Sequence, residues 1–208
     1  SNSSDNTGKN RITVVVTAPL NSDIHAAPFD SKASLGGNTS VVDYTKEIID
    51  QINSLPDYVF EALRKTKHII VLVKDSVVEA LPELKGRLTP DGRKYDELAG
   101  IRLGHHIVIA TRSTYYGWDK SYVALHEIGH GFDFAEKGLS FRPEFRWAWR
   151  NDYERLGSDY FKSQLRETFA ESFYKYFDNP KKMEKEWPAL FEFMDKYHKC
   201  KSGTNKDC

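Results

Sequence analysis

The run His126-Glu127-Ile128-Gly129-His130 constrains the fold of this chain more than any other feature of its sequence. Because an α-helix turns about 100° per residue, the two histidines would lie on one face, about 40° apart and one turn from each other. Two imidazoles at this spacing can bind one Zn²⁺. The glutamate, about 100° round the helix, can accept a proton from a water molecule that the metal activates. The run therefore predicts a helix that shows one face to a cleft.

A helical pattern of apolar residues surrounds the run and supports this prediction. An apolar stripe lies on the side opposite the histidines, at Leu125, Ile128, Phe132 and Ala135. We expect a helix over residues 119–137, anchored by that stripe, with Gly138 as its C-cap. The alternative is a chance match on the surface of an ordinary helix, which the flanking apolar residues disfavour. Of the other histidines, only His105 and His106 are candidates for the border of the cleft.

A catalytic zinc site needs a third protein ligand besides the two histidines. The metzincin arrangement is disfavoured, because Asp133 and Glu136 stand where it requires a glycine and a third histidine. A glutamate on a later helix is the other solution, and Glu167 and Glu171 lie four residues apart there. They flank an apolar stripe made of Phe169, Ala170, Phe173 and Phe177. One of the two glutamates can bind the metal while the other accepts the N–H of a ligand histidine, unless both are solvated surface residues.

The remaining sequence divides into a mixed first part and a helical second part. β-Branched and apolar runs predict strands at residues 11–18, 68–74 and 106–111. Helical patterns occur at residues 41–55, 56–65, 76–84, 119–137, 142–156, 164–178 and 181–198. Residues 85–103 are expected to form a loop. The fold class is therefore α+β, with a small mixed sheet and helices in a first lobe and only helices in a second.

The chain is long enough for one domain with a single core. We expect a flexible arm over residues 1–10, one domain over 11–199 and a polar tail over 200–208. The two lobes of the domain are expected at about 11–138 and 139–199. Four aromatic residues early in the second lobe are expected in the core: Phe141, Phe145, Trp147 and Trp149.

Composition argues against several classes of protein. The 208 residues carry 30 Lys and Arg and 30 Asp and Glu, and this zero net charge argues against nucleic acid as a partner. No window approaches the roughly 18 consecutive apolar residues of a transmembrane helix. The two cysteines are Cys200 and Cys208. A disulfide between them is the favoured interpretation, and it predicts an oxidising, extracellular location; two exposed free thiols are the alternative.

Two motifs in a fixed order give the sequence a family resemblance. The run at 126–130 is followed, after 36 residues, by Glu-Thr-Phe-Ala-Glu-Ser-Phe at 167–173. This pair of motifs resembles the catalytic domain of anthrax lethal factor and the secreted bacterial Pro-Pro endopeptidases. Residues 93–100, which lead into a strand and then the zinc helix, also resemble the family's segment upstream of the cleft. The resemblance covers about residues 90–198.

The resemblance implies a zincin-like, two-lobed metalloprotease fold and a role for each motif residue. It implies one Zn²⁺ with three protein ligands, which are His126, His130 and Glu167. Glu171 would support the metal site, and Tyr160, seven residues before the ligand glutamate, would point at the activated water or the substrate carbonyl. Glu127 would be the general base.

One loop departs from the pattern of the Pro-Pro endopeptidases. They carry a tryptophan in the loop before the cleft strand, where this sequence has Thr89-Pro90-Asp91-Gly92. Tyr95 is the aromatic residue that can take a neighbouring place, and His106 and Trp118 are further candidates for lining the cleft. The departure leaves Pro-Pro specificity open without touching the metal ligands.

We therefore expect a secreted, zinc-dependent endopeptidase of the gluzincin class that hydrolyses peptide bonds in extended protein substrates. The substrate peptide is expected to lie along the edge of strand 106–111. The alternatives are a Pro-Pro-specific endopeptidase that acts on surface proteins and a non-catalytic binding module with a zincin fold. The expected partner is a peptide or protein substrate, with no nucleic acid and no membrane span, and the chain is expected to be a monomer.

Overall fold

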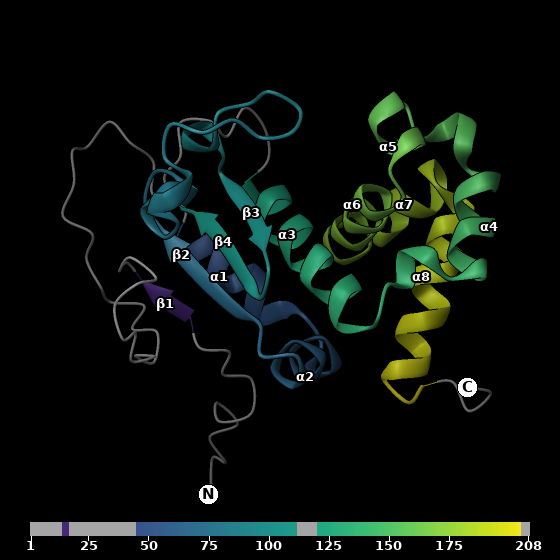
Figure 1. Cartoon of the computed structure of the whole chain (residues 1–208). Coiled ribbons are helices and arrows are strands. Elements are labelled where there is room, and N and C mark those ends of the chain that lie inside the picture. The colour runs from purple at the N-terminus through teal and green to yellow at the C-terminus, as the bar shows by residue number, and fades with distance from the viewer. Residues whose placement is uncertain (1–13, 17–44, 112–119, 205–208) are drawn as a thin grey trace, which may run out of the picture.

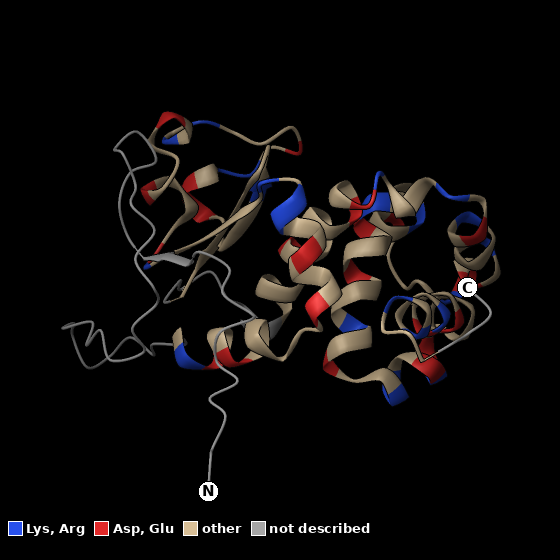
Figure 2. Cartoon of the chain, turned by 90° about the horizontal axis from the view of Figure 1, so that it is seen from below, with Lys and Arg blue, Asp and Glu red and all other residues tan. Residues whose placement is uncertain are grey.

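The structure is a computed structural model that describes residues 14–16, 45–111 and 120–204 of the chain. Its architecture confirms the predicted α+β class. A small sheet and the first helices form one half of the molecule, and helices alone form the other (Figure 1). Basic and acidic residues are interspersed over both halves (Figure 2). None of the described helices is long and apolar enough to cross a membrane.

The described residues form one four-stranded sheet in the order β1-β2-β4-β3. Its strands are β1 (Val14–Val16), β2 (Ile69–Val73), β3 (Gly100–Leu103) and β4 (His106–Ala110). β2 is parallel to β1 and β4, and β3 runs antiparallel to β4. Gly104 makes the tight turn into β4 with a φ of 59°, a conformation that glycine adopts readily. β3 is therefore the edge strand, and β4 is paired on both sides.

Two helices precede β2, a long helix follows β4, and the second half is helical. The first half contains α1 (Thr45–Ser54) and α2 (Asp57–Lys65), and α3 (Lys120–Ala135) joins the halves. The second half contains α4 (Pro143–Asn151), α5 (Asp159–Ser163), α6 (Leu165–Asp178), α7 (Pro180–Glu186) and α8 (Pro188–Lys201). Short 3₁₀ turns are η1 (Val77–Glu79), η2 (Pro82–Leu84), η3 (Tyr95–Glu97), η4 (Leu139–Phe141) and η5 (Tyr153–Arg155). A proline opens α4, α7 and α8, where its missing N–H costs no helical hydrogen bond.

Alternate residues of the sheet face two different cores. Ile107 and Ile109 of β4 are buried with residues of α1, α2 and α3 in a large core. Val108 and Ala110 face the opposite way and pack with residues around η1 and η2 in a smaller core. The large core continues through α3 into α4, α6, α7 and α8, so one hydrophobic cluster joins the two halves.

The apolar stripe of α3 is buried as its pattern predicts, with Ile128 and Phe132 at most 1% exposed. Helix α3 therefore has one side fixed against the sheet and the first helices, while α6 packs along another side. Figure 1 shows α3 lying between the sheet and α6. This packing fixes how the helix presents its histidines.

Several predicted elements differ from the structure. The expected helix over 142–156 ends at Asn151 and is followed by the turn η5. The expected loop over 85–103 ends in β3, whose Gly100 and Arg102 interrupt the apolar alternation that predicts a strand. The expected helix over 76–84 is instead the two turns η1 and η2, with Pro82 opening the second. The expected helix over 181–198 is divided into α7 and α8 at Pro188, because proline cannot donate a hydrogen bond inside a helix.

The aromatic residues of the second half divide between core and surface. Phe145 is fully buried and Trp149 packs against the core, but Phe141 is 50% exposed and Trp147 60% exposed, so their predicted burial is wrong. At the other end of this half, Cys200 of α8 is disulfide-bonded. Its expected partner Cys208 and the arm over 1–10 lie outside the described residues.

Candidate metal centre

A close contact between α3 and α6 brings the predicted ligands together. Gly129, between the two histidines, lies against α6: a Cβ on it would come within 3.0 Å of Phe173 Cβ and 3.1 Å of Ala170 Cα. Such distances are tighter than most Cβ contacts, so any larger residue here requires α3 or α6 to shift by a few tenths of an ångström. The glycine therefore sets the spacing at which side chains of α3 reach those of α6.

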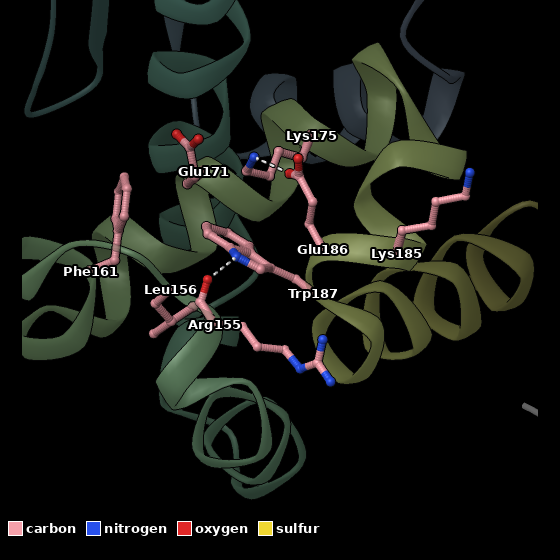
Figure 3. Close-up of a pocket in the computed structure, with 8 residues that line it drawn as sticks. All are labelled: Arg155, Leu156, Phe161, Glu171, Lys175, Lys185, Glu186 and Trp187. Atoms are coloured by element: carbon pink, nitrogen blue, oxygen red, sulfur yellow. Dashed lines mark hydrogen bonds and ion pairs between the residues drawn. The ribbon is translucent and has the colours of Figure 1, made fainter.

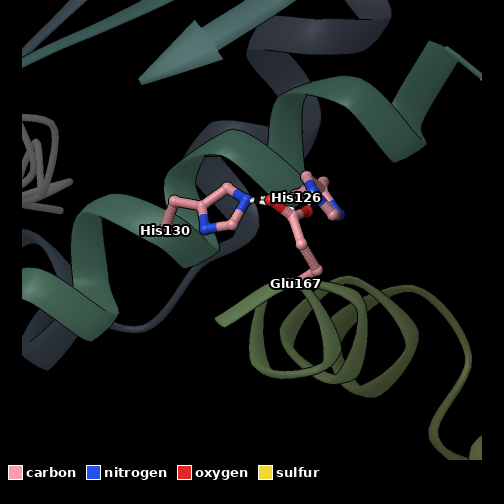
Figure 4. Close-up of side chains that lie close together, drawn as sticks. All are labelled: His126, His130 and Glu167. Carbon is pink, nitrogen blue, oxygen red and sulfur yellow. Dashed lines mark hydrogen bonds and ion pairs between the residues drawn. The ribbon is translucent and has the colours of Figure 1, made fainter. Parts of the chain in front are cut away.

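Three side-chain atoms meet at this contact. His126 Nε2 lies 3.0 Å from Glu167 Oε2, and His130 Nε2 lies 3.2 Å from the same oxygen. The two Nε2 atoms are 3.1 Å apart. Figure 4 shows the two imidazoles on α3 and the carboxylate on α6 pointing toward one another. Within the described part of the chain, no other group of three histidine, cysteine or carboxylate side chains converges in this way.

The donor set fits a zinc ion. Two histidine nitrogens and one carboxylate oxygen are ligands of catalytic zinc sites, and ligands about 2.0–2.1 Å from a tetrahedral ion lie about 3.4 Å from each other. The three distances of 3.0–3.2 Å between His126, His130 and Glu167 are close to this value. Two imidazole nitrogens and one carboxylate oxygen that face one another are jointly satisfied by a cation at the point where they meet.

Charge at the centre also favours a cation. Burial lowers the pKa of His126, but the carboxylates of Glu167, Glu171 and Glu127 outweigh it and raise the pKa to about 9. Burial acts to raise the pKa of Glu167, yet His126 and His130 hold it well below its usual range. The carboxylate of Glu167 is thus ionised at neutral pH, as a metal ligand must be.

Glu171 lies behind His126, one of the predicted ligands, and is buried with it. Its Oε2 is 3.6 Å from His126 Nδ1, and among the described residues neither atom has a hydrogen-bond partner. The hydroxyl of Tyr122 hydrogen-bonds to Glu171, and its ring lies 5.1 Å from the His126 ring. A carboxylate on this side of the imidazole directs the other nitrogen, Nε2, toward the metal position. Sequence reasoning missed Tyr122, although it stands one helical turn before His126 on the same face.

Glu127 points to the other side of the ligands, toward the sheet. A Cβ on Gly100 of β3 would lie 2.9 Å from Glu127 Cγ and would overlap Val123. The edge strand therefore passes directly over the base of the Glu127 side chain and restricts its orientation. The sequence signal for this contact was the Gly104-His105 pair, which is typical of a two-residue hairpin turn and thus indicates a strand before it.

Tyr160 reaches the centre from α5. The carbonyl of the next residue, Phe161, accepts hydrogen bonds from Trp149 Nε1 (3.2 Å) and Thr168 Oγ1 (2.7 Å), so this short helix is held in place. Burial raises the pKa of Tyr160, and the charge of Glu167 together with a hydrogen bond to it raises the pKa further. The tyrosine is 40% exposed and stays protonated at neutral pH, so its hydroxyl can donate a hydrogen bond to a ligand at the centre.

The residues predicted to line the cleft do not gather at this centre. His106 alternates with Ile107 and Ile109, so it lies on the sheet face with Val108, turned away from α3. Tyr95 packs against the small core on that same far face. The structure therefore does not bring these two residues to the metal centre, and strand alternation turns His106 to the other face of the sheet. Trp118 lies outside the described residues.

A cavity of about 510 Å³ lies on the far side of α6. Its eight lining residues, drawn in Figure 3, come from η5, α5, α6, α7 and the start of α8, and include Phe161, Glu171 and Trp187. Lys175 spans it in an ion pair with Glu186. Figure 3 shows the Glu171 carboxylate pointing away from the other lining side chains. Glu171 therefore borders the cavity while its charged end faces His126.

Comparison with known proteins identifies the family. A profile described as anthrax toxin lethal factor, N- and C-terminal domain, matches residues 39–197 of the chain. The chain belongs to the anthrax toxin lethal factor family. This lethal factor family member is also similar in fold to the Pro-Pro endopeptidase PPEP-2 from Paenibacillus alvei, with a TM-score of 0.65. The two sequences are 19% identical, and the match covers 74% of this chain and 90% of that chain.

No curated protein matches the sequence of this lethal factor family member. The family match and the structural match confirm the predicted family and the predicted zincin-like fold. The family match includes α3 and α6, and hence the three converging side chains.

Proposed function

We propose that this protein is a zinc-dependent endopeptidase. The observation that carries the proposal is the convergence of His126, His130 and Glu167, with Glu127 and Tyr160 on either side of the point where they meet. Membership of the lethal factor family and the fold shared with PPEP-2, an endopeptidase by its title, support it. A zinc ion held by the three ligands would polarise a water molecule and lower its pKa toward neutrality.

Each flanking side chain then has a distinct task. The carboxylate of Glu127 accepts the proton of the attacking water and passes it to the nitrogen of the leaving amine. The hydroxyl of Tyr160 donates a hydrogen bond to the oxygen of the scissile carbonyl as negative charge develops on it. Glu171 and Tyr122 hold the His126 ring in its orientation and do not touch the substrate.

The substrate peptide is proposed to pair with β3. The expectation that it lies along 106–111 is wrong, because β4 is hydrogen-bonded to β2 on one side and to β3 on the other. No other described strand pairs with the outer edge of β3, and its Gly100 lies against Glu127. An extended peptide added to this edge would therefore pass the proposed base with its main chain hydrogen-bonded.

Secretion is part of the proposal. The disulfide-bonded state of Cys200 supports it, since disulfides persist in oxidising compartments. Lys and Arg are balanced by Asp and Glu, so a peptide or protein is proposed as the partner in preference to nucleic acid.

A single substitution tests the activity. Glu127→Gln should retain the metal and lose peptide cleavage by about 10²- to 10⁴-fold, because only the proton acceptor is removed. The measurement is cleavage of a mixed peptide library, read by mass spectrometry, with zinc content determined on the same samples. Glu144→Gln, an exposed glutamate in the first turn of α4, is the control and should behave as wild type. Equal cleavage by Glu127→Gln and wild type would overturn the mechanism, and zinc without cleavage of any peptide by wild type would favour a binding module.

A further inference from the structure

Two arginines flank α3 just beyond the metal centre. Arg102 is the first: it lies on β3, two residues from Gly100 and therefore on the same strand face, which α3 covers. Its guanidinium carbon is 5.2 Å from the centre of the Phe134 ring. Phe134 stands four residues after His130 on α3, so it continues the face of the two histidines by one turn, and it is 50% exposed.

Arg166 is the second and comes from the opposite half of the molecule. It immediately precedes the ligand Glu167 in the first turn of α6 and is exposed. Its guanidinium carbon lies 5.0 Å from the centre of the Phe141 ring. Phe141 belongs to η4, which follows α3 and packs against both α3 and α6. Each arginine thus rests on an aromatic ring that is half exposed.

Phe134 and Phe141, the rings under the two guanidinium groups, lie at the end of α3 and in the turn η4 that follows it. Burial lowers the pKa of Arg102, the positive charge of Arg166 lowers it further, and the carboxylates of Glu127 and Asp133 act in the opposite direction. Asp133 is itself occupied, because it accepts hydrogen bonds from the backbone N–H and the hydroxyl of Ser140 at 2.8 and 2.7 Å.

Neither arginine is neutralised by a direct partner within the described part of the chain. Arg102 Nη1 donates to the carbonyl oxygen of Gly104 at 2.8 Å, which leaves the other N–H groups of its fork for a ligand. Among the described residues, no carboxylate forms an ion pair with Arg102 or Arg166. Two cations that rest on aromatic rings at this end of α3, with N–H groups left over, favour the approach of an anionic group.

We propose that Arg102 and Arg166 bind a carboxylate of the substrate and make the enzyme select peptides that carry one near the scissile bond. This inference rests on the proposed peptidase function and specifies its substrate class. The carboxylate is either that of an Asp or Glu side chain or that of the peptide's own C-terminus. The planar fork of arginine matches both, and it binds a carboxylate through two parallel hydrogen bonds.

The place of the carboxylate along the peptide follows from the helix geometry. Phe134 lies about 6 Å along α3 from His130, at 1.5 Å per residue. An extended peptide advances about 3.3 Å per residue. The selected carboxylate is therefore expected about two residues from the bond that is cut, on the side of the cleft where α3 ends.

Matched peptides test the proposal. One set carries Glu or Gln at each position within four residues of the cleaved bond, and a second set differs only in a free or amidated C-terminus. The wild type should cleave the matching carboxylate peptide with a kcat/KM about 10- to 100-fold above that of its neutral partner, chiefly through KM. The first set identifies a side-chain carboxylate as the ligand, and the second identifies the C-terminus.

Arginine variants then assign the preference to these residues. Arg102→Gln and Arg166→Gln should each reduce the ratio of kcat/KM for the carboxylate peptide to kcat/KM for its neutral partner. The double variant should bring this ratio near one while it still cleaves the neutral peptides. The double Lys variant, which keeps the charge, should retain part of the preference. Arg150→Gln, an exposed arginine in the last turn of α4, removes the same charge elsewhere and should leave the ratio unchanged.

Failure of this inference can be told from failure of the proposed function. If peptides are cut but the carboxylate and neutral forms are cut equally, the carboxylate site is disproved and the peptidase stands. If no peptide is cut, the peptidase proposal fails. Binding of the same labelled peptides to Glu127→Gln, measured by fluorescence anisotropy, then tests the carboxylate site without cleavage. Tighter binding of the carboxylate peptide, lost when Arg102→Gln and Arg166→Gln are added, supports the site. Equal binding of the two peptides overturns it.

Discussion

Gly100 of the edge strand lies directly against the side chain of Glu127, and a Cβ there would stand 2.9 Å from Glu127 Cγ. Gly100→Ala should therefore displace the proposed base while leaving the metal ligands in place. We expect kcat to fall at least about tenfold and the free energy of unfolding to fall by about 1–3 kcal/mol, as is usual for overpacking. Peptide turnover and zinc content are measured together. Normal turnover in this variant would show that the strand does not position Glu127.

The same substitution at Gly129 should have a different effect. A Cβ there meets Ala170 Cα at 3.1 Å and Phe173 Cβ at 3.0 Å, so it pushes α6, and Glu167 with it, away from α3. Gly129→Ala is therefore expected to weaken zinc binding about tenfold or more, whereas Gly100→Ala does not. A competition titration with a zinc-binding dye measures the affinity. Unchanged zinc affinity in Gly129→Ala would contradict the role given to this helix contact.

Removal of the Tyr160 hydroxyl tests the proposed oxyanion donor. Tyr160→Phe should lower kcat by about 10²-fold, equivalent to about 3 kcal/mol in the activation barrier, with little change in KM. The fold should persist, because α5 is held through the carbonyl of Phe161 and not through this hydroxyl. Circular dichroism and steady-state kinetics provide the comparison. A variant as fast as wild type would remove Tyr160 from the mechanism.

His68 gives the fold a pH dependence of its own. Burial, and then the charges of His105, Arg102 and His106, lower the pKa of His68 to about 4, against about 6.5 in an unfolded chain. Between these two pKa values, His68 binds a proton in the unfolded state but not in the folded state. The contribution of neutral His68 to the free energy of unfolding is therefore complete above about pH 6.5 and is lost as the pH falls toward 4.

Comparison of His68→Gln with wild type isolates this effect from other titrating groups. From pH 7 to pH 4, the free energy of unfolding of the wild type should fall further than that of His68→Gln. The excess fall should be on the order of 3 kcal/mol. Urea unfolding at a series of pH values supplies the measurement. Parallel curves over this range would show that His68 is not held neutral by burial.

The parts of the site that could be predicted are those encoded in short stretches of sequence. The spacing of His126 and His130 fixes a shared helix face, and Glu167 stands at the border of an apolar stripe that had to be buried. What could not be predicted depends on how two elements meet. The contact of Gly100 with α3 exists only because β3 is the edge strand of the sheet.

The misplaced cleft residues have the same origin. His106 is close to the site in the sequence, but the alternation of β4 turns it to the opposite face of the sheet. Phe141 was assigned to the core by its apolar character alone, whereas its position in η4 leaves it half exposed beneath Arg166. The type of a residue suggests its role, but its burial and its neighbours in the fold determine whether it has that role.

Anomalous diffraction from crystals grown with zinc, measured on both sides of the zinc absorption edge, would locate the ion and its ligands. We predict one strong peak bound by His126 Nε2, His130 Nε2 and Glu167 Oε2, and its loss in Glu167→Gln. A site without a peak, or a peak bound by other residues while Glu167 points elsewhere, would contradict it.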